Sequence, residues 1–199
     1  MHKKLLMKSV VVFCGSSDGV DEKYSKEALT LGKTLANNNV RLVYGGAKIG
    51  IMGKVASGVL DNGGDVIGVI PKFLMKKEVF HPNLSELIVT QDMHERKLKM
   101  HELSDGIIML PGGYGTLEEF FEMLTWAQLG LHQYPIGVLN TNGFYDALIE
   151  MLQHIVNQGF VKQINLDMIL VVTSVDELLQ KMNNYNPVPV PKWLTKEQT

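Results

Sequence analysis

The chain has 199 residues, of which 45% are hydrophobic and 20% charged, and its formal net charge is −2. These values are typical of one well-buried globular domain, and they give no reason to expect a nucleic acid or an anionic membrane as partner. Cys14 is the only cysteine, which excludes an internal disulfide and favours a reducing, cytoplasmic location. No apolar run is long enough for a membrane helix, and the run at 10–14 is too short for a signal peptide.

Seven short apolar runs rich in β-branched residues divide the chain. In chain order they are 9–14, 41–44, 65–70, 86–90, 106–110, 135–139 and 168–172. Because they do not alternate with polar residues, they predict strands buried on both faces, as in a parallel sheet.

Between most of these runs the apolar residues recur with helical spacing. The clearest stripes are Tyr24, Ala28, Leu31 and Leu35, then Leu117, Phe120, Phe121 and Leu124, then Phe144, Leu148, Leu152 and Ile155. Capping boxes predict helix starts at Asp92-x-x-Glu95, Thr116-x-x-Glu119 and Ser174-x-x-Glu177. Alternating strands and helices predict one α/β domain over 1–185, with a doubly wound sheet of about seven mostly parallel strands, followed by a proline-rich tail at 186–199.

Three loops that follow predicted strands are rich in glycine and other small residues: CGSSDG (14–19), YGGAKIGIMG (44–53) and PGGYGT (111–116). Loops of this kind bring backbone N–H groups close to an anion, and ligands of doubly wound sheets bind at the carboxyl ends of the strands. We therefore expect a phosphorylated ligand, although none of the loops has the G-x-G-x-x-G or P-loop spelling. The alternative is three tight turns without a ligand. The expected contacts are Gly15, Ser16, Gly45, Gly46 and Gly112.

The segment DMHERKLKMHELSD (92–105) places an arginine on the inward face of a helix. Arg96 falls within the arc of Met93, Met100 and Leu103. A buried guanidinium needs a partner, and either a carboxylate or a ligand phosphate would serve. The alternative is an arginine whose head reaches solvent.

The same segment resembles a zinc motif only superficially. His94-Glu95 and His101-Glu102 each begin like H-E-x-x-H, but the second histidines are missing. We expect no catalytic metal, and we interpret His94 and His101 as a surface or supporting pair.

Three glutamates follow the last glycine loop. Glu118, Glu119 and Glu122 lie opposite Leu117, Phe120 and Leu124 on a helical wheel, which is typical of a solvated face. Glu119 would also complete a capping box. However, a carboxylate in the first turn is within reach of whatever the glycine loop holds, so a functional role stays open.

The stretch PGGYGTLEE (111–119) resembles the P-G-G-x-G-T-x-x-E signature of the Lonely Guy family, the cytokinin-activating phosphoribohydrolases. Further landmarks of this family are matched in its order by CGSS (14–17), YGGAKIGIMG (44–53), GGDVIGVIP (63–71), MHERK (93–97) and TWAQLG (125–130). The resemblance covers nearly the whole chain to about residue 180.

The resemblance implies a single Rossmann-like domain, a homodimer, and hydrolysis of the N-glycosidic bond of a nucleoside 5′-monophosphate without a cofactor. The products would be the free base and ribose 5-phosphate, and the substrate either an N6-isoprenoid AMP or AMP itself. The family's essential arginine and glutamate fall on Arg96 and Glu119. Its substrate contacts fall on Glu78, Lys97, Gly113, Tyr114, Gly115, Thr116, Leu117, Glu118 and Thr125.

Two other functions remain open from the sequence. A non-catalytic carrier of nucleotides or of the molybdenum cofactor would need the glycine loops but has less use for both Arg96 and Glu119. A general nucleotide-salvage nucleosidase would share every motif. The label lysine decarboxylase, which many relatives carry, finds no support in a lysine motif typical of pyridoxal phosphate binding.

Overall fold

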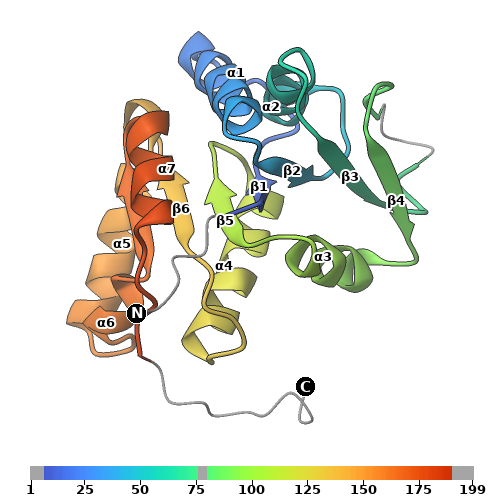
Figure 1. Ribbon diagram of the computed structural model, residues 1–199. Coiled ribbons are helices and arrows are strands. Elements are labelled where there is room, and N and C mark those ends of the chain that lie inside the picture. Colours follow the sequence, from blue (N-terminus) through green and yellow to red (C-terminus); the bar gives the residue numbers. More distant parts are fainter. Residues whose placement is uncertain (1–6, 76–79, 190–199) are drawn as a thin grey trace.

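In the computed structural model, which describes residues 7–75 and 80–189, seven parallel strands form one sheet in the order β4-β3-β2-β1-β5-β6-β7 (Figure 1). The strands are β1 (Ser9–Phe13), β2 (Arg41–Tyr44), β3 (Val66–Pro71), β4 (Glu86–Thr90), β5 (Gly106–Met109), β6 (Ile136–Leu139) and β7 (Ile169–Val172). This arrangement confirms the predicted doubly wound α/β fold. The strand order reverses between β1 and β5, so the loops after these two strands diverge there and leave room for a ligand.

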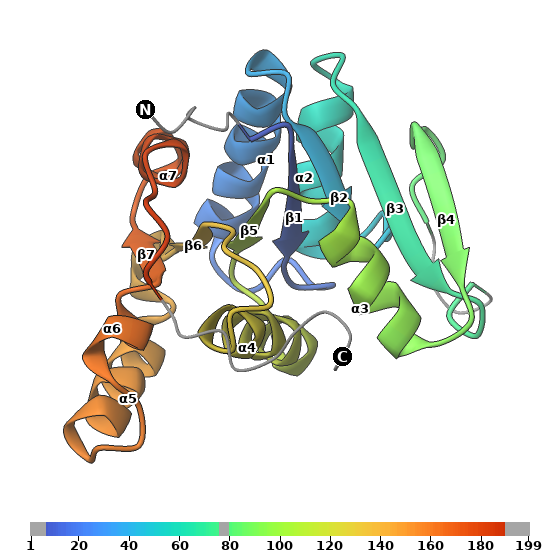
Figure 2. The same cartoon turned by 60° about the horizontal axis from the view of Figure 1, so that its bottom comes forward.

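Helices cover both faces of the sheet, as the two ribbon views show (Figures 1 and 2). Those that pack on one face are α1 (Glu22–Asn37), α2 (Gly50–Leu60) and α7 (Val175–Asn183). Those that pack on the other are α3 (Met93–Glu102), α4 (Tyr114–Gln128) and α5 (Asp146–Asn157). The short helices η1 (Thr141–Gly143) and α6 (Gln163–Leu166) flank α5 in the chain.

Burial of the strands differs between the middle and the edges of the sheet. β1, β3, β5 and β6 are buried throughout, as their apolar runs predict. The prediction of burial on both faces is wrong for β4 and β7, because both are edge strands and helices cover them incompletely. Val89 of β4, for example, is 44% exposed.

Two of the three predicted capping boxes mark helix starts. The Asp92 carboxylate accepts from the N–H of Glu95 at the start of α3, and the Ser174 hydroxyl accepts from that of Glu177 at the start of α7. The prediction for Thr116 is wrong, because α4 begins three residues earlier than that, with Gly113 as its uncapped N-cap. Thr116 is instead buried in the first turn.

The predicted apolar stripes differ in how deeply they are buried. In α1, Ala28, Leu31 and Leu35 are fully buried. The stripe assigned to α5 is only partly buried, and Phe144 precedes that helix and is exposed.

Two remaining predictions concern membrane helices and the C-terminal tail. Within the described residues, no helix combines the length and apolar character that a membrane crossing requires. The expected tail lies outside the described residues from position 190 on.

Candidate active site

The three predicted glycine loops meet at the carboxyl ends of β1, β2 and β5. Gly15 donates its N–H to the carbonyl of Pro111 over 3.0 Å, which joins the first loop to the third. Met52 and Ile51 donate to the carbonyls of Gly15 and Ser17 over 3.1 and 3.4 Å, which joins the second loop to the first. The sequence therefore placed these three loops correctly at one edge of the sheet.

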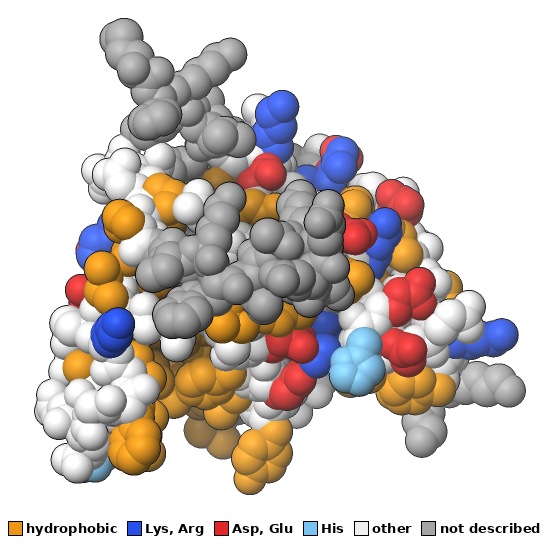
Figure 3. Space-filling model, turned by 90° about the horizontal axis from the view of Figure 1, so that it is seen from below, with side chains coloured by type: hydrophobic (Ala, Val, Ile, Leu, Met, Phe, Trp, Pro, Cys, Tyr) orange, Lys and Arg blue, Asp and Glu red, His pale blue; other side chains and the backbone are white. Residues whose placement is uncertain are grey.

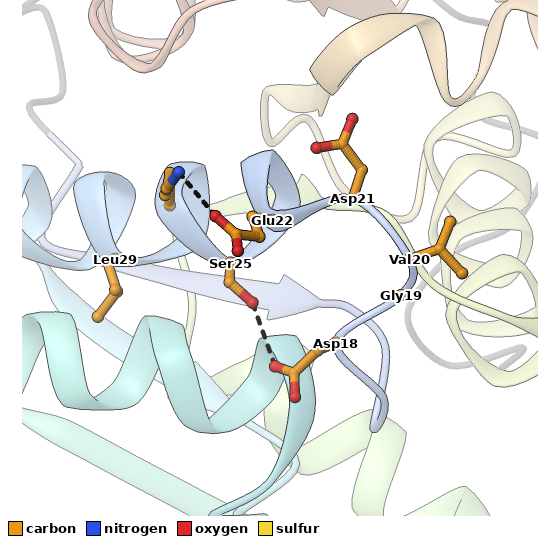
Figure 4. Close-up of a pocket in the computed structure, with 8 residues that line it drawn as sticks. Asp18, Gly19, Val20, Asp21, Glu22, Ser25 and Leu29 are labelled. Atoms are coloured by element: carbon orange, nitrogen blue, oxygen red, sulfur yellow. Dashed lines mark hydrogen bonds and ion pairs between the residues drawn. The ribbon is translucent and has the colours of Figure 1, made fainter.

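The helix starts at this edge are not equally available to a ligand. Asp21 caps α1 through the N–H of Lys23 (2.9 Å), and Figure 4 shows the neighbouring hydrogen bond from Ser25 to Asp18 (3.1 Å). The first N–H groups of α2 donate to the first loop, as described above. The second glycine loop therefore joins α2 to a neighbouring loop, a packing role that its glycines also serve.

The start of α4 is open by comparison. No side chain caps it, and the N–H groups of Tyr114, Gly115 and Thr116 precede the first intrahelical donor, the N–H of Leu117, which bonds to the carbonyl of Gly113. A Cβ atom added at Gly113 or Gly115 would meet nothing within 4 Å. Free N–H groups and the positive end of the helix dipole make this terminus suitable for an anion.

Arg96 lies buried beside this helix start, with only 8% of its surface exposed. Its Nε donates to the carbonyl of Val69 within β3 (3.0 Å), and its Nη1 lies 3.5 Å from Oε1 of Glu119. The prediction of an inward arginine with a partner is confirmed, and the partner is a carboxylate of the chain itself. The alternative of an arginine reaching solvent is wrong.

Glu119 is the second buried charge of the site and is 9% exposed. The interpretation of a solvated face is wrong for this residue, because its carboxyl points to the buried Arg96 side chain of α3. Burial raises the pKa of Glu119 from its ordinary 4.5 to about 7, while the charge of Arg96 counteracts the rise. Near neutral pH both the ionised and the protonated carboxyl are therefore populated, so Glu119 can act as electrostatic partner, base or acid.

Lys97 forms a second charged group next to the Arg96–Glu119 pair. Although only 5% exposed, it donates a hydrogen bond to Glu118 (2.6 Å) and forms an ion pair with Glu122 (3.0 Å). Two cations thus face three carboxylates at this site, and little positive charge remains for a phosphate. Figure 3 shows acidic and basic side chains adjacent to one another on the face of the molecule seen there.

The first and third loops also border a cavity of about 280 Å³. Tyr24 and Phe144 line it together with Gly112 and Ser16, and their rings meet edge to face at 5.5 Å. The sequence did not identify Tyr24 or Phe144 as cavity-lining residues, because their spacing assigns both to apolar helix stripes. The glycine-loop motifs do not include either residue.

The remaining predicted contacts lie at varying depth. Gly45 and Gly46 are buried, Ser16 is exposed, and Leu117 is half-buried. Thr125, two turns further along α4, is exposed and donates its hydroxyl to the carbonyl of Phe121 (2.7 Å). Glu78 lies outside the described residues. A substrate role for each of these residues stays a prediction.

The two histidines of α3 do not form a pair, so that interpretation is wrong. His94 is exposed, whereas His101 packs against the rings of Trp126, His132 and Tyr134 at 5.0 to 5.3 Å. Among residues 7–75 and 80–189, no group of three or more His, Cys, Asp or Glu side chains could hold a metal ion.

Solved structures of other proteins have a similar fold. The molybdenum cofactor binding protein from Rippkaea orientalis superimposes with a TM-score of 0.68 at 20% identity, over 89% of this chain and 96% of that one. The Moco carrier protein from Chlamydomonas reinhardtii does so with a TM-score of 0.66 at 20% identity, over 88% and 95%. At this level of identity the likeness concerns the fold alone.

Sequence comparison is more specific. A family model described as "Possible lysine decarboxylase" matches residues 52–182. The cytokinin riboside 5′-monophosphate phosphoribohydrolase LOG3 of Arabidopsis thaliana is 43% identical over 93% of this chain and 86% of its own length. Its relative LOG5 from the same plant is 45% identical over 93% and 81%. On this identity and coverage, the chain belongs to the Lonely Guy family, that of the cytokinin riboside 5′-monophosphate phosphoribohydrolases.

Proposed function

We propose that this protein hydrolyses the N-glycosidic bond of a purine nucleoside 5′-monophosphate and releases the free base and ribose 5-phosphate. The observation that carries the proposal is the buried Arg96–Glu119 pair beside the open start of α4. The names of the plant relatives support an N6-substituted AMP of the cytokinin type as substrate. AMP, as in nucleotide salvage, is the second candidate because the same motifs would serve it.

The phosphate binds at the start of α4 in this proposal. Arg96 and Lys97 are already paired with carboxylates, so the N–H groups of Tyr114, Gly115 and Thr116 supply the attraction. Anchoring the phosphate there brings the ribose toward Glu119, one turn further along the same helix. A free nucleoside lacks this anchor and is therefore a poor substrate.

Glu119 performs the chemistry at C1′. Water adds across the C1′–N bond, with its hydroxyl going to C1′ and a proton going to the base nitrogen. As the bond breaks, positive charge develops on the ribose, and an ionised carboxylate nearby stabilises it and orients the attacking water. Arg96 fixes the Glu119 carboxylate and lowers the pKa that burial raises, which keeps part of it ionised at neutral pH.

The name lysine decarboxylase does not suit the lysine of this site. Burial alone would lower the pKa of Lys97, but its hydrogen bonds to Glu118 and Glu122 raise that pKa above the ordinary value. An amine that attacks a carbonyl group must lose its proton, and these contacts disfavour that loss. A non-catalytic carrier, in turn, would have no use for a carboxyl group buried against an arginine.

We also propose that the protein is a cytoplasmic homodimer that acts without nucleic acid. Leu98, Tyr114 and Phe121 expose apolar side chains on α3 and α4 near the site, which supports an interface there. The single cysteine and the weak negative charge fit this location and the absence of a nucleic-acid partner.

Two substitutions test the assignment of Arg96 and Glu119. Glu119→Gln and Arg96→Ala should each lower kcat/KM for the monophosphate by about 100-fold or more, because each removes a charge that acts on the transition state. Glu102→Gln, on the exposed end of α3, serves as the control. Folded Glu119→Gln protein with full turnover would refute the catalytic role.

A further inference from the structure

Gly45, at the end of β2, is buried against the side chain of Arg96. A Cβ atom at this position would press into Nη2 of Arg96 and would lie 2.9 Å from Sδ of Met52. Both atoms belong to side chains, which can be displaced without moving the main chain. The backbone conformation of Gly45 is also open to other residues, because its φ is not in the left-handed region.

The other glycines of this loop are needed by the backbone itself. Gly46 and Gly50 have φ of +86° and +64°, which disfavours any side chain. A Cβ atom at Gly53 would overlap the carbonyl of Lys48. Gly45 therefore differs from the other glycines of this loop. At Gly45 a side chain fills the space that a Cβ atom would need, whereas at the others the main chain disfavours a side chain.

The Arg96 side chain is held by contacts on several sides. Nε of Arg96 donates to the Val69 carbonyl, and Nη1 lies 3.5 Å from Glu119 and 3.9 Å from the sulfur of Met93. Nη2 faces Gly45. A methyl group at position 45 would displace the guanidinium end while leaving the rest of the fold in place.

We propose that Gly45 is a positioning residue, which leaves the space that seats the Arg96 guanidinium against the Glu119 carboxyl. This inference rests on the proposed function, and it gives Gly45 a role other than the ligand contact expected from the sequence.

The pKa of Glu119 depends on where the Arg96 guanidinium lies. The charged or ionisable groups around its carboxyl are Arg96 and Lys97 from α3, Glu118 and Glu122 from α4, and Cys14 from the loop after β1. Among these, Arg96 lowers the Glu119 pKa most strongly. Displacing Arg96 should therefore raise it.

The test compares Gly45→Ala with a matched packing control, Gly137→Ala in β6. A Cβ atom at Gly137 would press into the end of Leu178 and would lie 2.9 Å from Sδ of Met182, on the opposite face of the sheet from Arg96. For Gly45→Ala we expect kcat to fall about 10- to 100-fold with little change in KM, because small misplacement of a catalytic group has effects of this size. Gly137→Ala should leave kcat and its pH dependence unchanged.

Two further measurements separate positioning from a general effect. If Gly45 acts through Arg96, then adding Gly45→Ala to Arg96→Ala should lower kcat no further. Carboxyl ¹³C NMR of the protein without substrate should show the Glu119 pKa raised by about half a unit or more in Gly45→Ala, but not in Gly137→Ala.

An unchanged Glu119 pKa together with wild-type kcat in folded Gly45→Ala protein would overturn the inference. A wild-type protein that cleaves no nucleotide would instead refute the proposed function. The NMR titration would still decide whether Gly45 seats Arg96.

Discussion

Replacing Glu119 with glutamine should stabilise the folded protein at neutral pH and above, while it removes activity. Burial raises the pKa of this carboxyl from 4.5 to about 7, so the folded state disfavours its ionised form. One pKa unit corresponds to roughly 1.4 kcal/mol, and the rise therefore represents about 3 kcal/mol of lost stability. Glutamine cannot ionise, and a chain that carries it avoids this loss.

The ordinary pKa of 4.5 and the raised pKa of about 7 define the pH range in which the effect appears. Below pH 4.5 the carboxyl is protonated in both the folded and the unfolded chain, so the two proteins differ by a constant amount. Between pH 4.5 and about 7 the unfolded chain ionises first, and wild-type stability falls relative to Glu119→Gln. Above about pH 7 the difference stays at its maximum.

Urea unfolding of both proteins at pH 5, 6, 7 and 8 measures this difference directly. Glu102→Gln provides the reference for a glutamate on an exposed helix end. A free-energy difference between wild type and Glu119→Gln that does not change with pH would refute the reasoning, because Glu119 would then titrate alike in both states.

Two other ionisable groups give independent predictions. Burial lowers the pKa of His132 to about 4, so the stability that its neutral ring contributes should be lost, by about 3 kcal/mol, as pH falls from about 6.5 to about 4. His132→Gln should flatten the urea midpoint over this range, and an unaltered acid profile would contradict the account. Lys97→Met should destabilise the protein by about 2 kcal/mol in urea, since it leaves the carboxylates of Glu118 and Glu122 without their cation. Adding Glu122→Met should restore part of that loss, and a wild-type midpoint in the single variant would show that the ion pairs contribute nothing.

Much of the fold could be predicted because the signals are local. Short runs of β-branched residues predicted all seven strands, and Asp92 and Ser174 marked two helix starts. The start of α4 was misplaced because Thr116 fits a capping box, whereas the helix begins earlier, directly after Gly113. Local patterns also carry no information on which strands lie at the edges of a sheet.

The site could be predicted only in part, because local patterns do not show contacts between different helices and strands. The inward position of Arg96 follows from its own helix, but the burial of Glu119 depends on how α3 and α4 pack together. A helical wheel of α4 alone assigns Glu119 to the solvent side. In the same way, the sequence reveals a glycine at position 45 but not that Arg96 occupies the space beside it.

The central claim is that a phosphate-anchored ribose is cleaved from its base at Arg96 and Glu119. Chromatography of reactions with AMP, N6-isopentenyl-AMP, adenosine and ATP tests it most directly. The account predicts free base and ribose 5-phosphate from a monophosphate but not from adenosine, and the ratio between the two monophosphates distinguishes cytokinin activation from salvage. Folded protein that binds nucleotide but releases no base from any of the four would contradict the account and favour a carrier.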